Sequence, residues 1–506
     1  MDYENTSKTI LSVTVISMTA RLLSLVSTQL YIAYFGVRDP YVNVYSFALI
    51  VPNTIFTSIG TMLTTVVVPT YASLRGRNDK SAKKFLDDIL SVSSFFIFLL
   101  IVIGMLLTPY FFWFSEFYDD HSRLQFGVFS LRVLMPVMFF YGLNFVFQGV
   151  LQSHGKFLLP AAVAIPSSLT VILYVLLLGE RFGLHGLVIA TLLGLSAQSL
   201  VMLPAVWKLG YRYRFSFDLK SPDMRRCFKM AGPVLVAASA YAINTMFNNF
   251  IALNLNWTAM LNYVYHLIVV SVTSFVFSVT AVYYPKLSVE WGDGRLQHYR
   301  ESLVQIMKLL IFILVPAAFG LFALRYRLFD LLARWGEFTA YDVVVAGNMM
   351  ALYALGILSM GFKEVLDRGF YAQKNTKVSA VVGFCIMGLN IVFTLLLVRV
   401  MGIFALPLSY SVSTTVGVVG LLWVMRGKTD GFGSGIWLTA CKTLVASVLM
   451  LGVVYVVMRY SVIGDSFMAR LAQFVLPVIS GMTVYFVSAY FLKIEQLDFI
   501  IKKVFS

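Results

Sequence analysis

Long apolar runs fill the chain, and short polar connections separate them. A membrane-spanning helix needs about 20 mostly apolar residues. The pattern predicts fourteen such helices, at 9–36, 42–71, 85–112, 125–152, 158–179, 184–207, 230–254, 257–284, 302–324, 341–365, 378–399, 402–425, 437–458 and 468–492. None of the connections is long enough to fold as a soluble domain. We therefore expect an all-α polytopic membrane protein.

The two halves of the chain share landmarks at nearly constant spacing. Three pairs of equivalent residues carry this repeat, namely Pro69 with Pro285, Gly149 with Gly369, and Lys156 with Lys377, at offsets of 216, 220 and 221 positions. The repeat predicts two pseudo-symmetric six-helix lobes, 1–208 and 209–426, followed by a C-terminal helix pair, 427–506. Each repeat holds an even number of spans, so the lobes are parallel. Transporters built from parallel repeats bind substrate at the repeat interface and alternate their access.

Composition and charge placement agree with a membrane protein. Of the 506 residues, 59% are hydrophobic and 12% are charged, whereas soluble domains carry about 25% charged residues. About 25 Lys and Arg fall on the even-to-odd connections and termini and about 9 on the other side, which predicts cytoplasmic termini. We interpret the net charge of +15 as mostly topogenic, with a secondary attraction to anionic lipid. We interpret no basic stretch as an aromatic stacking platform, so no nucleic-acid partner is expected.

The residues favour a transporter over an enzyme. Three separate cysteines without CxxC spacing exclude a disulfide scaffold and a thiolate metal site. The polar N-terminus predicts no cleaved signal peptide. The sequence shows no P-loop and no HExxH, and the acidic stretches at 86–88 and 118–121 read as solvated charge. Transport would then draw on an ion gradient or on the gradient of the substrate.

Several polar residues lie within predicted spans, where each is a functional candidate. Arg21, midway along the first span in VISMTARLLSLV, either contacts an anion in an aqueous cavity or bonds carbonyls of the protein. His266 in the eighth span is either a proton-responsive anion contact or a core histidine. Asparagines often join helices, yet the set as a whole predicts a polar interior where the lobes meet. The set is Arg21, Ser27, Asn43, Asn53, Asn244, Asn248 and His266.

Further charges lie near the ends of two spans. Arg132 on the fourth span either ends the cavity or snorkels to the outer surface. Four charges of alternating sign crowd the inner end of the tenth span and predict either mutual pairing or a solvated gate. They are Lys363, Glu364, Asp367 and Arg368.

Four passages carry a resemblance to a known family. They are ARLLSLVSTQLYIAYFG at 20–36, IVPNTIFTSIG…VVVPTYASL at 50–74, WGEFTAYD at 335–342 and GFYAQKNTKV at 369–378. Over nearly its whole length the chain resembles the MurJ/MviN branch of the multidrug/oligosaccharidyl-lipid/polysaccharide exporter superfamily, the lipid II flippases. The resemblance implies a bacterial inner-membrane flippase that moves the undecaprenyl-pyrophosphate-linked peptidoglycan precursor outward by alternating access. A cation-lined cavity would hold the pyrophosphate, and the lipid tail would lie near the last two spans.

The resemblance also assigns residues and shows departures. Arg21 falls on the family's first-helix arginine, but Ser27 replaces the second arginine, Asn43 an aspartate, and His266 an arginine of the eighth helix. Arg132 falls on a basic residue of some members. Some members also bind sodium in the second lobe, where Asn390 and Thr394 lie one turn apart without the expected carboxylate. Sodium or proton coupling is thus a candidate, and no other cofactor is expected. We expect a monomer working alongside cell-wall synthesis proteins.

Other functions remain open at this point. The chain could move another polyprenyl-linked glycan. It could be a cation-coupled multidrug exporter, although that function needs a carboxylate deep in a lobe and the first lobe offers none. A membrane-embedded glycosyltransferase or scaffold is disfavoured by the two-lobe repeat and the missing acid cluster.

Overall fold

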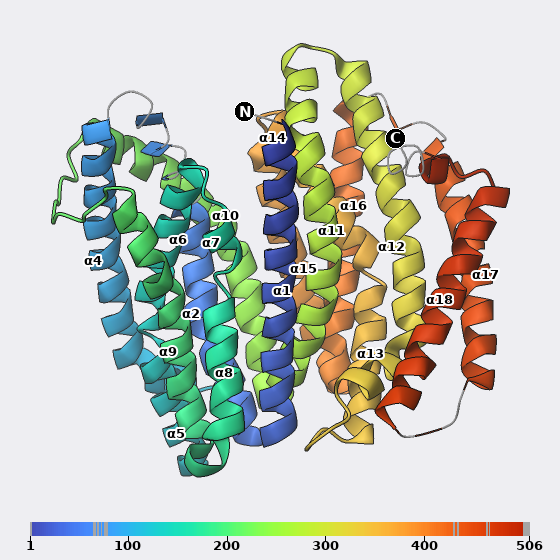
Figure 1. The fold of residues 1–506 in the computed structure, drawn as a ribbon, viewed down its shortest axis with the longest axis horizontal. Helices are drawn as coiled ribbons and strands as arrows, with labels where there is room; N and C mark the ends of the chain where they lie inside the picture. The colour runs from blue at the N-terminus through green and yellow to red at the C-terminus, as the bar shows by residue number, and fades with distance from the viewer. Residues whose placement is uncertain are drawn as a thin grey trace. The chain divides into compact units, whose positions relative to one another are not determined.

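The computed structural model describes residues 3–63, 67, 70–71, 73–74, 79–428, 431–432, 435–461, 464 and 466–498. Every regular element within these ranges is a helix (Figure 1). This confirms the all-α class. Pro69, one landmark of the predicted repeat, lies outside the described residues.

The chain divides into two compact units, Met1–Ala259 and Met260–Ser506. The first unit contains α1 (Tyr3–Phe35), α2 (Pro40–Met62), α4 (Asp79–Phe111), α5 (His121–Leu134), α6 (Val137–Ser153), α7 (Leu158–Ala161), α8 (Ile165–Leu177), α9 (Gly179–Lys208) and α10 (Pro222–Asn254). The second contains α11 (Thr258–Gly292), α12 (Leu296–Leu332), α13 (Ala340–Ala354), α14 (Ile357–Ala372), α15 (Thr376–Met401), η2 (Gly402–Phe404), α16 (Ala405–Lys428), α17 (Gly435–Tyr460) and α18 (Phe467–Phe491). The first two residues of α11 belong to the first unit. Because α10 packs on α2, the first unit extends past the lobe boundary that the sequence predicts at 208. The predicted division by repeat stays a prediction.

Local sequence signals start several of these helices. Asp39 accepts hydrogen bonds from the backbone N–H groups of the first turn of α2, and Pro40 occupies the first helical position. Ser221 caps α10 in the same way, again followed by proline. At α13, Thr339 and Asp342 form a reciprocal capping box. Such caps satisfy the N–H groups that the first turn of a helix leaves without partners.

Ten helical segments among the described residues are long and apolar enough to cross a bilayer, or eleven if the bent pair α13–α14 counts as one span. One of them, Thr376–Gly427, has 52 residues. As one straight helix it would be about 78 Å long, more than twice the thickness of the hydrocarbon core. Instead the segment turns at η2, and α15 packs on α16. These two helices correspond to the separate spans predicted at 378–399 and 402–425. Helices α10 and α11 cover two further predicted spans but are not among the ten. The count of fourteen therefore stays a prediction.

The repeat is visible in the backbone of the two halves of the chain. The break between α5 and α6 at Met135–Pro136 recurs between α13 and α14 at Leu355–Gly356, 220 positions later. Three pairs of positive φ angles recur at offsets of 219 or 220, namely Gly36 (90°) with Asn256 (57°), Gly155 (72°) with Lys374 (58°), and Gly183 (54°) with Gly402 (55°). Left-handed residues are uncommon. Their regular recurrence supports the two-fold repeat independently of residue identity.

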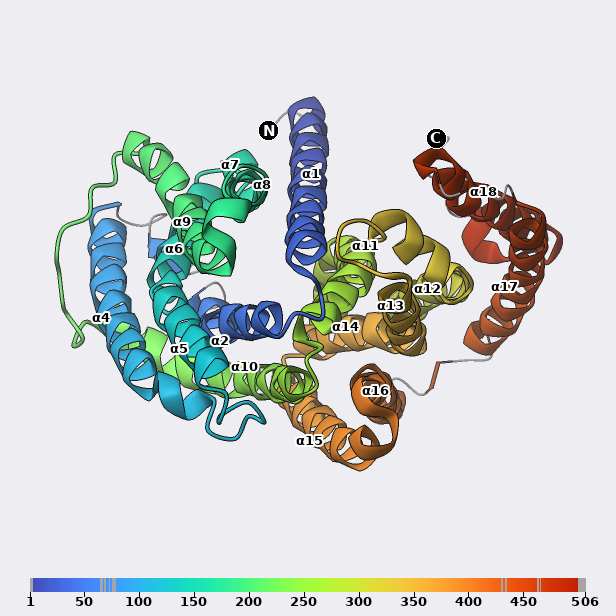
Figure 2. The ribbon, with the colours of Figure 1, turned by 90° about the horizontal axis from the view of Figure 1, so that it is seen from below.

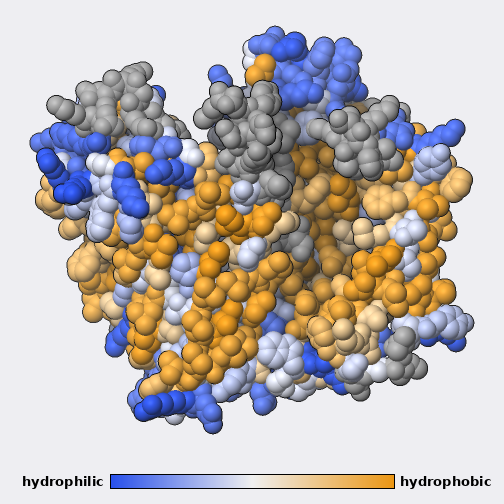
Figure 3. All heavy atoms as spheres, in the orientation of Figure 1, coloured by the Kyte–Doolittle hydropathy of each residue, from blue (hydrophilic) through white to orange (hydrophobic). Residues whose placement is uncertain are grey.

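The last two helices belong to the second unit. Helices α17 and α18 pack on each other and on α12. Phe312 of α12, Met450 of α17 and Tyr485 of α18 share a buried core, and the Tyr485 hydroxyl donates to the Phe312 carbonyl. On the face shown in Figure 3, apolar side chains cover the middle of each unit and hydrophilic residues gather at its ends. That distribution suits helices surrounded by lipid.

Candidate functional site

A polar stripe runs along α1. Helical spacing places Ser17, Arg21, Ser24 and Thr28 on one face of this helix. Arg21 and Ser24 are exposed, and the other two side chains are half-buried. In the described ranges, no residue forms a hydrogen bond or ion pair with Arg21. The protein thus leaves the arginine charge unneutralised, and within an apolar span such a charge needs water or an anion beside it.

Ser27 and Asn43 face the interior of the first unit instead. Ser27 is buried, its hydroxyl donates to the Ser24 carbonyl, and it points about 120° around the helix from Arg21. Asn43 is fully buried, and its amide nitrogen donates to the carbonyls of Val37 and Asp39 at 3.1 and 2.9 Å. The Asn43 amide oxygen accepts from the backbone N–H of Ala259 at 3.0 Å. The structure gives Asn43 a structural role, and substrate contact stays a prediction for both residues.

Helices α2 and α10 bring two predicted asparagines, Asn53 and Asn244, to one level, with a third nearby. Phe47 packs on Phe250 with ring centroids 6.3 Å apart, and the Ser58 hydroxyl donates to the Ala238 carbonyl at 3.5 Å. These two contacts fix an antiparallel register that places Asn53 level with Asn244. Asn53 is exposed, whereas Asn244 is buried, and its amide oxygen has no hydrogen-bond partner among the described residues. Asn248 lies one turn further along α10 on the same face.

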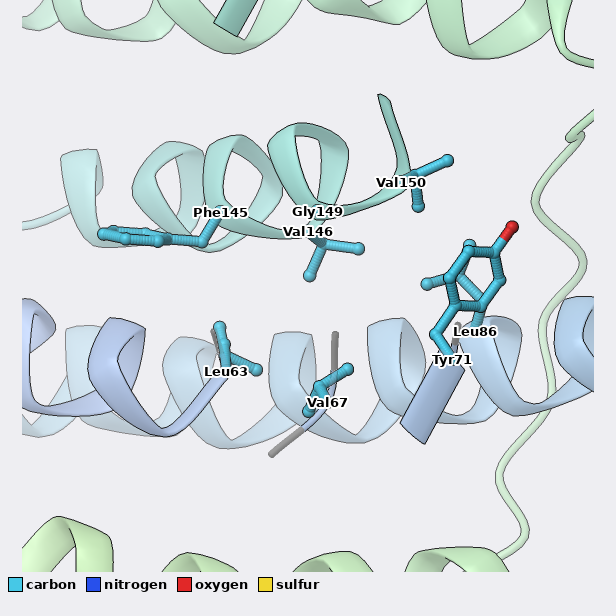
Figure 4. A pocket seen from close by; sticks show the side chains of 8 residues that line it. All are labelled: Leu63, Val67, Tyr71, Leu86, Phe145, Val146, Gly149 and Val150. Carbon is cyan, nitrogen blue, oxygen red and sulfur yellow. The ribbon is translucent and has the colours of Figure 1, made fainter. Parts of the chain in front are cut away.

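Two cavities of this unit suit apolar groups or nothing, whereas a third, of about 600 Å³, includes the polar side chains of Ser122, Gln125 and His185 in its lining. A pocket of about 500 Å³ between α2, α4 and α10 is almost entirely apolar; it is lined by Phe47, Thr54, Ile55, Phe111, Ala242, Ile243, Met246, Phe247 and Phe250. It could take hydrocarbon but offers nothing to a pyrophosphate. The pocket drawn in Figure 4, between α4, α6 and the residues after α2, holds about 10 Å³. It is too small for any group of a substrate.

Arg132 is not brought together with Arg21. Its guanidinium Nε donates to the Met105 carbonyl of α4 at 3.4 Å, and the side chain is exposed. Arg21 lies on α1, which packs on α7 and α8. Arg132 therefore contacts a neighbouring helix of its own unit, and its role at a cavity stays a prediction.

In the second unit, the four charges of α14 pair with one another. The Lys363 ammonium lies 2.7 Å from an Asp367 oxygen, and the Arg368 guanidinium lies 2.9 Å from Glu364. The Asp367 side chain is 9% exposed, and its other oxygen is buried with no hydrogen-bond partner in the part of the chain that the structure describes. His266 is exposed on α11. Whether the charges act as a gate stays a prediction.

The predicted sodium ligands are buried at the contact between α15 and α16. Asn390 and Thr394 are fully buried, and so are Ser409 and Ser413 on the facing helix. Among the described residues, no three His, Cys, Asp or Glu side chains lie close enough together to hold a metal ion. The cluster therefore supplies only neutral oxygens, and sodium binding stays a prediction.

One sequence interpretation is wrong. The acidic pair within 86–88 is not solvated charge, because Asp87 and Asp88 are 8% and 2% exposed. Their carboxylates bind the connection between α9 and α10. From the sequence alone, two adjacent aspartates near the end of a span are expected to be solvated, because the segment that covers them cannot be identified. The alternating residues of that connection, YRYRFSF, were the available signal.

Long apolar helices and helix breaks repeated at one offset are typical of polytopic membrane transporters. The family profile described as lipid II flippase MurJ matches residues 32–472. The chain belongs to this family.

Relatives carry the same family description, and solved structures share the fold. A probable lipid II flippase MurJ of Rickettsia prowazekii is 21% identical over 95% of this chain and 96% of its own length. The lipid II flippase MurJ of Burkholderia cenocepacia is 23% identical over 88% and 89%. The fold is similar to a lipid II flippase MurJ in an inward closed conformation, with a TM-score of 0.79, 19% identity and coverage of 95% and 98%. An inward-facing multidrug resistance MATE transporter gives a TM-score of 0.66 at 14% identity, covering 83% and 98%.

Proposed function

We propose that this protein translocates lipid II from the cytoplasmic to the outer leaflet of the bacterial inner membrane by alternating access, with both termini in the cytoplasm. The family match supports the substrate, since the relatives are named lipid II flippases. The observation that carries the proposal is Arg21, an exposed and unneutralised cation on an apolar span. A lipid-linked pyrophosphate is the charge partner that a flippase would bring to it.

The α1 stripe has the chemistry that this substrate needs. A guanidinium can donate two parallel hydrogen bonds to one phosphate group. The hydroxyls of Ser17 and Ser24, on the same face, add neutral donors without further positive charge. With Ser27 where relatives carry a second arginine, the pyrophosphate would depend on Arg21 more heavily. His266 is the candidate cation of the second unit.

The remaining parts of the proposal concern energy and partners. The protein works as a transporter rather than an enzyme, and a sodium or proton gradient drives it through the neutral oxygens near Asn390 or through Asp367. It acts as a monomer alongside cell-wall synthesis proteins. The alternative substrates are another polyprenyl-linked glycan and the drugs of a multidrug exporter, and transport of either in place of lipid II would replace this proposal.

The test is complementation of a bacterial strain depleted of its own lipid II flippase. Arg21→Ala should abolish growth and lower outward lipid II by about 10- to 100-fold, because a hydrogen bond to a charged group contributes about 1.5–3 kcal/mol. Arg21→Lys should retain part of the activity. Arg181→Ala is the matched control, since Arg181 is also exposed but lies over the Phe182 ring at 5.3 Å. Normal growth of the Arg21→Ala strain would refute the role of Arg21, and failure of the unmodified chain to complement would refute lipid II as substrate.

A separate experiment addresses His266. If the imidazole contacts the pyrophosphate when protonated, transport should change between about pH 5.5 and 7.5, the range in which histidine titrates. His266→Gln should flatten that profile. An identical profile in both proteins would exclude this contact.

A further inference from the structure

The connection between α9 and α10, residues 209–221, is fixed along α4; we call it the strap. It runs as extended chain beside α4 in Figures 1 and 2. One Asp87 oxygen accepts from the Tyr211 hydroxyl at 2.7 Å and from the Arg214 backbone N–H at 3.1 Å. One Asp88 oxygen accepts from the Ser216 hydroxyl and from the backbone N–H of Asp218 at 3.2 Å. Two buried carboxylates therefore hold one side of the strap.

Further bonds complete this attachment. The Ser91 hydroxyl of α4 bonds the Tyr213 hydroxyl at 2.8 Å and accepts from the Ser216 backbone N–H at 3.3 Å. Burial, followed by the hydrogen bond to Asp87, raises the pKa of Tyr211, so this hydroxyl remains a donor at physiological pH. The strap is thus a positioned element with a defined outward side.

The outward side interleaves apolar and basic side chains. The exposed apolar residues are Tyr213 (50%), Phe215 (79%), Phe217 (43%) and Leu219 (40%). The exposed cations among them are Arg212, Arg214 and Lys220. From the sequence, this stretch is not interpreted as an aromatic stacking platform, yet basic and aromatic residues alternate along it. The burial of acidic side chains beneath the strap leaves its cations in excess on the surface.

The neighbouring surface identifies the partner. The Phe217 ring packs edge-on against Phe95 of α4, with centroids 5.9 Å apart. From Phe95 the exposed apolar surface continues along α4 through Phe96, Phe98 and Leu99, within a segment long and apolar enough to span the bilayer. The aromatic row of the strap is therefore continuous with a lipid-facing surface. A nucleic acid would have no access to rings immersed at that boundary.

We propose that the strap binds the headgroups of anionic phospholipids. Its aromatic rings lie at the level of the membrane interface, where such rings are favoured. Arg212, Arg214 and Lys220 extend to the lipid phosphates. Each basic residue near an anionic membrane surface favours binding by about fivefold. This binding is separate from lipid II transport and does not depend on it.

The test is lipid titration of the full chain by native mass spectrometry, comparing phosphatidylglycerol with phosphatidylcholine. Arg212→Gln/Arg214→Gln should lower the preference for phosphatidylglycerol by about 30-fold, since two cations are lost. Lys374→Gln/Lys377→Gln is the control, because it removes two exposed cations outside the strap, one before α15 and one in its first turn. Its preference should stay within twofold of the unmodified chain.

A second variant tests the attachment. Asp87→Asn weakens the anchoring of the strap while every cation remains, so the preference should fall although net positive charge rises. Retained preference in Arg212→Gln/Arg214→Gln, or an equal loss in the Lys374/Lys377 control, would overturn the proposal. Loss of single-stranded DNA binding in the arginine variant without any change in lipid preference would also overturn it, in favour of a nucleic-acid partner. Growth complementation is scored separately, so failure of lipid II transport and failure of the strap proposal are distinguishable.

Discussion

Asn43 offers a sharp test of structural against substrate-binding roles. Its side chain makes three hydrogen bonds to backbone groups, two as donor and one as acceptor, at a position with no exposed surface. Asn43→Ala would leave the buried Ala259 N–H and the Val37 carbonyl without these partners. A buried group left without its hydrogen bond costs about 1–3 kcal/mol, so we expect a loss of about 3 kcal/mol in the free energy of unfolding.

Asn43→Asp should cost at least as much. The carboxylate keeps an acceptor for the Ala259 N–H but replaces the donor that faces the carbonyl oxygens of Val37 and Asp39 at about 3 Å. An ionised group facing two acceptors in a buried site loses two hydrogen bonds and is poorly solvated. The geometry of the site therefore favours the amide that this chain carries.

The measurement is thermal and denaturant unfolding of the purified protein in detergent, with growth complementation alongside. Asn53→Ala, an exposed asparagine on the same helix, should change stability by less than about 0.5 kcal/mol. If Asn43→Asp is as stable as the unmodified protein, the structural reasoning fails. If it is stable yet inactive, Asn43 acts on the substrate instead.

Other predictions concern backbone and charge. Lys374→Gly should stabilise the protein by about 0.5–1 kcal/mol in thermal unfolding, because a left-handed backbone conformation costs a non-glycine residue about 1–2 kcal/mol and the flexibility of glycine offsets part of that gain. Gly155→Ala, at the left-handed position equivalent by the repeat, should destabilise the protein. Lys363→Met should cost about 3 kcal/mol by leaving the buried Asp367 carboxylate unpaired, and Lys363→Met/Asp367→Leu should recover most of that loss in the same assay. The hydrogen bond and salt bridge from Lys84 of α4 lower the pKa of Asp218. The stabilisation that this pair gives is therefore present above the unfolded pKa of about 4 and is lost only as pH falls further. Hydrogen exchange of the strap, corrected for intrinsic rates, should not change between pH 5 and 8.

The sequence was most informative about periodic and backbone features. Apolar runs predicted the helices, and the paired turns at Gly36, Gly183 and Gly402 lie where runs end. Arg21 was recognisable because an arginine within an apolar run violates the pattern whatever surrounds it. Local signals therefore suffice where one residue conflicts with its immediate neighbours.

Roles that depend on distant partners were not predictable. Asn43 looks like any polar residue on a span, and only the approach of Ala259, 216 positions later, gives its oxygen a partner. Asp87 looks solvated until Tyr211 is placed beside it. The packing of α10 on α2 likewise depends on side-chain fit between helices, which periodicity does not encode.

The turns at Gly183 and Gly402 bear on how the chain enters the membrane. Gly183 is a left-handed break near the start of α9, and Gly402 is the left-handed residue that ends α15, so each lies where the chain turns between apolar segments that pack on each other, α8 with α9 and α15 with α16. Connections this short leave no loop to be translocated separately, so each pair would leave the ribosome and enter the bilayer as one helical hairpin. A topology reporter inserted at either glycine would therefore disturb the biosynthetic step it is meant to monitor. Sidedness is better mapped from the longer connections.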